Sequence, residues 1–238
     1  MMFAALIVAA LVAASPTPAT APPEALTKPL REVVYDVSTS ERVDDITETF
    51  GGGPDAAPPS STDVEETHGT ITVDVMAKFE DGVLGIKVTE QWKVPALPLH
   101  FTGAVAPDGT VEFPAATIDP ATIELLPYLA THFAPDGSLV VGGHWSLDKV
   151  NGKSTVTTVY SVTAAAFDSV TIQKHTSIKA LGSESVDGTI VYQPSLLVAI
   201  SGTVKVRRTD MYSDGQTTRT IDLNFTRVSD TFQTAAKP

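Results

Sequence analysis

The chain has 238 residues, a formal net charge of −12 at pH 7 and no cysteine. The missing thiols exclude disulfide bonds, thiolate catalysis, cysteine-based metal sites and a lipid-modified cysteine. The acidic balance argues against nucleic acid as a partner, because phosphate binding needs an excess of Lys and Arg.

The N-terminal segment is expected to direct export. Residues 1–14, MMFAALIVAALVAA, form an apolar run of the length of a signal-peptide core, which is short for a membrane span. We expect this run to be a signal peptide, ending at residue 14 or at residue 21, with a membrane anchor as the alternative. Residues 15–30, rich in Pro, Ala and Thr, are expected to be a linker. The mature bacterial protein is then secreted or periplasmic, without a stable transmembrane span.

Residues 31–230 are expected to form one β domain, followed by a tail at 231–238. The first strand is predicted from Glu32 to Ser38, with Val33, Tyr35 and Val37 on one face. Residues 41–66 are acidic and rich in Gly and Pro, so they bury little apolar surface and are expected to be a flexible loop.

Three hairpins are predicted from Asp-Gly and Asn-Gly pairs, because these residues tolerate the positive φ of a two-residue turn. The turns are Asp81-Gly82, Asn151-Gly152 within 139–162, and Asp214-Gly215. Each register gathers apolar side chains on one face of its hairpin. The opposed pairs include Val75 with Val88, Ile71 with Trp92, Trp145 with Thr158, Gly143 with Tyr160, Val204 with Phe225, and Val206 with Leu223.

Two further features qualify this pattern. Gly202 suggests a bend or bulge within its strand. In the strand predicted from Ser169 to Ile178, Lys174 and Thr176 interrupt the apolar alternation, so that strand is expected to reach an edge or a solvent-facing half of the sheet.

One helical segment is predicted, from Asp119 to Phe133. Asp119 suits the N-cap, Pro120 the first helical position, and Pro127 should divide the run into two short helices. Its apolar stripe is expected to pack beneath the sheet or to cap a barrel; the functional alternative is a lid over a cavity.

The fold class is therefore all-β, with about ten to twelve antiparallel strands in a meander and one or two short helices around 120–133. A meander of this length must curl into a barrel, a half-barrel or a two-layer sandwich, because a flat sheet exposes an apolar face.

No catalytic residue, cofactor or metal site is predicted. The sequence contains no nucleophile elbow, HExxH motif or phosphate-binding Gly loop. Its five histidines stand singly, although they would still form a metal site if they converged in the fold: His68, His100, His132, His144 and His175. A basic cluster is compatible with an anion site, but Asp210 and Asp222 are placed to pair with part of it, so we interpret it as solvated charge: Lys205, Arg207, Arg208, Arg219 and Arg227.

Five aromatic residues lie on the predicted apolar faces: Trp92, Trp145, Tyr160, Tyr192 and Phe225. They are expected to be core residues in a filled barrel, and to line a ligand cavity in a hollow one.

The stretches LLPYL, VVGGHW and DGTIVYQPSLL, within about Pro127 to Val228, resemble secreted bacterial β-rich protein families of unknown function. The chain is also similar in class to periplasmic carriers whose half-barrels hold lipids, although no residue-level motif carries over. We expect a non-enzymatic exported binding module that carries or senses an apolar small molecule or lipid. The alternatives are a structural or protein-interaction module of the cell envelope, with an envelope protein as its partner, and a hydrolase without a recognisable motif.

Overall fold

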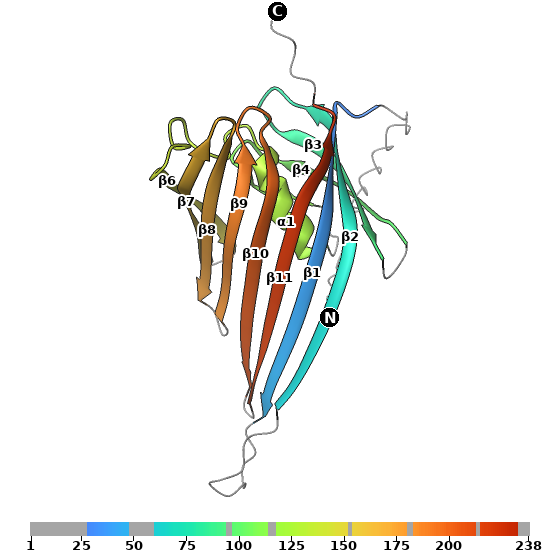
Figure 1. The fold of residues 1–238 in the computed structure, drawn as a ribbon, viewed down its shortest axis with the longest axis vertical. Helices are drawn as coiled ribbons and strands as arrows, with labels where there is room; N and C mark the ends of the chain where they lie inside the picture. The colour runs from blue at the N-terminus through green and yellow to red at the C-terminus, as the bar shows by residue number, and fades with distance from the viewer. Residues whose placement is uncertain are drawn as a thin grey trace, which may run out of the picture.

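The computed structural model describes residues 28–47, 60–93, 97–113, 118–151, 154–179, 183–212 and 215–232. The expected signal peptide, most of the linker and most of the tail lie outside these residues. Within them, one antiparallel sheet contains eleven strands in the order β5-β4-β3-β2-β1-β11-β10-β9-β8-β7-β6 (Figure 1). The strands are β1 (Arg31–Thr47), β2 (Ser60–Lys78), β3 (Leu84–Trp92), β4 (Leu99–Val105), β5 (Val111–Glu112), β6 (His144–Asn151), β7 (Ser154–Ala166), β8 (Ser169–Lys179), β9 (Ser183–Gln193), β10 (Val198–Tyr212) and β11 (Gly215–Asp230).

The sheet consists of two meanders that meet at its centre. The first strand, β1, pairs with the last, β11, while β5 and β6 form the two edges. The chain passes between these edges through the helix α1 (Pro120–Leu125) and the 3-10 helix η1 (Leu126–Leu129). The sheet curves around this helical segment as an open half-barrel (Figure 1). The all-β class, the antiparallel meander and the paired short helices are confirmed.

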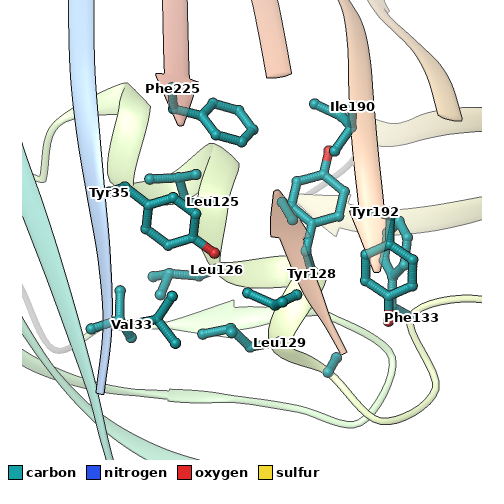
Figure 2. Packing of buried hydrophobic residues seen from close by; sticks show 14 of the residues in the cluster. Val33, Tyr35, Leu125, Leu126, Tyr128, Leu129, Phe133, Ile190, Tyr192 and Phe225 are labelled. Carbon is teal, nitrogen blue, oxygen red and sulfur yellow. The ribbon is translucent and has the colours of Figure 1, made fainter. Parts of the chain in front are cut away.

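The helical segment covers the apolar, concave face of the sheet. Asp119 caps α1 by accepting a hydrogen bond from Ala121 N at 2.8 Å, and Pro127 lies in the first turn of η1, as expected. Leu126 lies beside Val33 and Tyr35 of β1, and Tyr128 and Phe133 pack against Tyr192 of β9; all three side chains are buried (Figure 2). Burying one such side chain contributes about 1.5–3 kcal/mol. The segment that connects the two edges of the sheet thus covers the concave face and completes the core.

All three predicted hairpin registers are wrong by two residues. Val204 pairs with Leu223 instead of Phe225, Val75 pairs with Ile86 instead of Val88, and Trp145 pairs with Tyr160 instead of Thr158. Because side chains alternate with a period of two, this shift keeps the side chains of these pairs on their predicted faces; beyond the bulge between Val75 and Ala77 the difference is one residue, and the faces change there. Val204 and Phe225 are accordingly both buried on the concave face.

Aromatic rings explain two of these shifts. Gly202 lies opposite Phe225, where a Cβ atom would be 2.5 Å from Phe225 Cζ. Gly69 lies opposite Trp92 in the same way, with its hypothetical Cβ 2.7 Å from Trp92 Cε3. A large ring thus takes the space above a glycine on the neighbouring strand. Gly202 therefore makes room for a ring, and the bulge in β10 lies between Ala199 and Ser201 instead.

Because the registers differ from the predicted ones, two of the turns also lie at other residues than predicted. Tyr212 pairs with Gly215, and Asn151 with Ser154, so the connecting residues are 213–214 and 152–153, which lie outside the described residues. Gly215 has an extended backbone with φ of 158° and is a strand residue. The strand predicted from residue 139 begins only at His144, because residues 139–143 form turns in which Gly143 N donates to Val140 O.

The acidic segment is wrongly predicted to be a loop at both of its ends. β1 continues to Thr47 and β2 begins at Ser60, and their pairing extends to Ile46 opposite Ser60; residues 48–59 lie outside the described residues. Figure 1 shows β10, β11, β1 and β2 extending together beyond α1. Cross-strand hydrogen bonds such as Thr62 Oγ1 to Asp44 (2.9 Å) stabilise this extension in place of apolar burial.

β8 is also corrected. It lies between β7 and β9, not at an edge, and Lys174 and Thr176 are buried on its concave face. Lys174 tolerates burial because its ammonium group pairs with Glu124 of α1.

Candidate functional site

The five aromatic residues named above are all buried, with 2–8% of their surface exposed. Trp145, Tyr160 and Tyr192 surround Phe133, with ring centroids 5.5, 5.2 and 5.5 Å from it. Phe133 lies in the bend after η1, which ends at Leu129, and not in a helix as predicted. Phe225 instead packs edge-on against Tyr35 at 6.0 Å, and Trp92 lies across from Gly69. Around these aromatic residues, the concave face is filled by the protein's own side chains.

Two polar atoms in this core lack a hydrogen-bond partner within the described part of the chain, namely Tyr35 Oη and Trp145 Nε1. Burial raises the pKa of Tyr35, Tyr128 and Tyr160 well above the ordinary value of a phenol. These groups therefore stay neutral at physiological pH and act as hydrogen-bond donors or acceptors.

Two carboxylates, the buried Glu90 and the largely buried Glu124, hold α1 to opposite halves of the sheet. Glu90 on β3 accepts hydrogen bonds from Thr122 Oγ1 (2.5 Å) and Asp119 N (3.3 Å). Glu124 pairs with Lys174 on β8. Burial raises the pKa of Glu90 even though the hydrogen bond from Thr122 acts to lower it. Glu90 thus connects α1 and its N-cap to one half of the sheet, and Glu124 connects α1 to the other half.

The Lys174–Glu124 contact yields a testable prediction. Lys174→Met should lower the free energy of unfolding by about 3 kcal/mol, because Glu124 is left charged and largely buried without its partner. Adding Glu124→Leu should recover most of this loss, because an aliphatic pair needs no ionic partner. Urea unfolding of the two single variants and the double variant measures the coupling. Additive effects of the two substitutions would contradict the assignment.

A cavity of about 300 Å³ lies between α1 and the concave face of the sheet. Its aliphatic walls are Ile123 of α1 and a row of three side chains paired directly across β9, β10 and β11, namely Val186, Val206 and Ile221. The next row along the same strands is charged: Glu184, Arg208 and Arg219. Glu124 completes the lining from α1. An apolar floor therefore adjoins charged groups at one end.

Two larger hollows, of about 480 and 670 Å³, lie on the opposite face of the sheet. Outward-pointing polar side chains line them, including the ion pairs His175–Asp187 (2.7 Å) and Lys205–Asp222 (3.1 Å) in the smaller one. These four side chains are about half exposed, so water screens their charges. The cavity beneath α1, in contrast to these two hollows, combines apolar walls with a few convergent polar groups, as ligand sites do.

The sequence signal for this site is the alternation along one strand. On the concave face of β10 the order is Val204, Val206, Arg208, Asp210, a change from apolar to charged within one face. The predicted pairing of Asp210 and Asp222 with part of the basic cluster is confirmed, with Arg208 (3.1 Å) and Lys205 (3.1 Å) as their partners. The predicted register, with Val204 opposite Phe225, implies that Ile221 lies opposite Arg208, whereas Arg219 occupies that position.

Within the described ranges, no three His, Asp or Glu side chains gather closely enough to hold a metal ion. No helix in the same ranges has the length and apolar character needed to cross a membrane.

No protein-family model matches the sequence, and no curated protein matches it. Among solved structures, the chain is similar to one described as lipid–protein interactions in lipovitellin, with 8% sequence identity and a TM-score of 0.46. The match covers 89% of this chain and 26% of that chain, so this chain spans about a quarter of the other. At this level the similarity carries no information about a ligand.

Proposed function

We propose that this protein is a non-enzymatic binding module that holds a small apolar or amphipathic molecule in the cavity beneath α1. The observation that carries the proposal is the row Val186, Val206 and Ile221 facing Ile123 across an unfilled space on the concave face. Export, supported by the apolar run at residues 1–14, is part of the proposal.

The size of the cavity limits the ligand. Its 300 Å³ lies at the lower end of the range for ligand pockets. At roughly 30 Å³ for each water-sized group, it accommodates about ten non-hydrogen atoms. Partly exposed Val206 and Ile221 would lose further contact with water when a ligand enters, which contributes about 25 cal/mol for each Å² of apolar surface buried. An eight-carbon chain is a suitable probe.

Methyl-labelled NMR provides the test, because the aliphatic walls are all Ile and Val residues. Titration with 1-octanol should shift the methyl resonances of Ile123, Val186, Val206 and Ile221 saturably, leaving methyl groups on the opposite face unchanged. Val206→Phe should abolish these shifts by filling the cavity. Val159→Phe, at a half-exposed position on the opposite face, is the matched control and should preserve them. Shifts spread over the whole surface, or none at all, would refute the proposal.

A second candidate function, protein interaction, is favoured by the four-stranded extension of β10, β11, β1 and β2 (Figure 1). Near its end Met211 and Tyr212 are 63% and 60% exposed, so one large side chain on each face of the extension is accessible to a partner. This function predicts that Met211→Ser/Tyr212→Ser leaves stability and octanol binding unchanged while abolishing a partner interaction.

A further inference from the structure

We infer that the cavity beneath α1 selects amphiphiles with an anionic head group, a carboxylate or a phosphate monoester, which Arg208 and Arg219 bind. This inference rests on the proposed function. Arg208 lies directly opposite Arg219, and the pair is the next inward-facing row after Val206 and Ile221. A chain lying over the aliphatic row therefore brings its head group beside two guanidinium groups.

Both arginines retain hydrogen-bond donors for such a head group. The ion pair of Arg208 with Asp210 (3.1 Å) engages Nε, and so does that of Arg219 with Glu41 (2.7 Å). A guanidinium has five N–H donors, and in the described part of the chain no ion pair or hydrogen bond uses the Nη atoms of either residue. Like charges directly opposed on a sheet repel, so an anion between the two groups is stabilised by both.

The carboxylates around the cavity attract a cationic head group less strongly than the two arginines attract an anionic one. Glu124 is already paired with the buried Lys174. Glu184 lies opposite Arg208 on β9, so the order across the strands is Glu184, Arg208, Arg219, and Glu184 flanks the arginine pair on one side. Arg208 and Arg219 already engage Asp210 and Glu41, so among the described residues Glu184 is the lining carboxylate left to attract a cationic head group, which would also meet the two guanidinium groups.

Four eight-carbon probes test the inference on the full chain at low salt: octanoate, mono-octyl phosphate, 1-octanol and octylamine. Calorimetry should show octanoate or octyl phosphate binding about tenfold or more tightly than 1-octanol, as expected for charge-assisted hydrogen bonds. The variant Arg208→Gln/Arg219→Gln should remove this preference and leave the octanol affinity within about twofold of the original. Arg42→Gln, which removes an exposed arginine on the opposite face, is the matched control and should keep the preference. If the double variant is unfolded by circular dichroism, each single variant should weaken octanoate binding on its own.

The outcomes separate this inference from the proposed function. Equal binding of octanoate, octyl phosphate and 1-octanol, or tightest binding of octylamine, overturns the anionic head group while the apolar site stands. A preference that survives in the folded arginine variants also overturns it. If no eight-carbon probe binds, both proposals fail. The ranking of octanoate against octyl phosphate then distinguishes a fatty-acid-like ligand from a phosphate-bearing one.

Discussion

Gly202→Ala is expected to lower the free energy of unfolding by about 1–3 kcal/mol, although alanine usually suits a strand better than glycine. The added Cβ would lie 2.5 Å from Phe225 Cζ and 2.7 Å from Ile190 Cδ1. β10 is paired with both β9 and β11, so its backbone has little freedom to move away. Urea unfolding of the variant measures the loss.

The matched control is Gly85→Ala. There the new Cβ would make an ordinary contact of 3.5 Å with Ala77 Cβ, so the free energy of unfolding should stay unchanged or rise by up to about 1 kcal/mol. Phe225→Leu should partly rescue Gly202→Ala, because a smaller side chain leaves room for the methyl group. Equal effects of the two glycine substitutions would show that the ring does not determine this register.

Asp230→Ala is expected to lower the free energy of unfolding by about 3–5 kcal/mol, because it leaves a buried charge unpaired. Arg31 donates to both carboxylate oxygens of Asp230, from Nε at 3.0 Å and Nη2 at 2.7 Å, and Arg227 donates from Nη1 at 3.4 Å. The Arg31 and Asp230 side chains are 9% and 7% exposed. They connect the start of β1 to the end of β11, the pairing that joins the two meanders.

The same residue predicts a dependence on pH. Burial alone would raise the pKa of Asp230, but the hydrogen bonds from Arg31 and from Phe232 N, with the charges of Arg31 and Arg227, outweigh burial and lower this pKa. Because the folded-state pKa is below that of the unfolded chain, the stabilisation is present above the unfolded value and is lost as the pH falls through the folded value. Asp230→Ala should therefore lose less stability than the original protein between pH 7 and pH 3.

Asp222→Ala is the control for both measurements, because Asp222 also lies on β11. Its ion pair with Lys205 is about half exposed on both sides, so the cost should be below about 1 kcal/mol. If Asp222→Ala and Asp230→Ala were equally destabilising, the buried contact would not have the role assigned to it.

Which face of a strand is apolar could be predicted from the sequence, and which residues lie opposite one another could not. A register shifted by two residues sorts apolar and polar side chains equally well, so the alternation of Val204, Val206, Leu223 and Phe225 leaves such registers equivalent. Only the fit of a ring over a glycine distinguishes them, and that contact joins residues far apart in the chain.

The candidate site shows the same division. The aromatic residues are inward-facing as predicted, but whether they enclose a space depends on the segment between β5 and β6, whose Tyr128 and Phe133 fill it. The opposed arginines that border the cavity depend on the register, and the helix above them on a connection between two sheet edges.

By itself, the sequence determined the all-β class, the antiparallel hairpins, the two short helices and the inward face of most hairpin strands, because these depend on local periodicity, capping and turn residues. Only the tertiary structure decided the registers, the burial of Lys174 against Glu124, the continuation of β1 and β2 through the acidic segment, and the position of the cavity. Each of these is a contact between distant segments, whose free energy depends on how surfaces fit together once the sheet has curved.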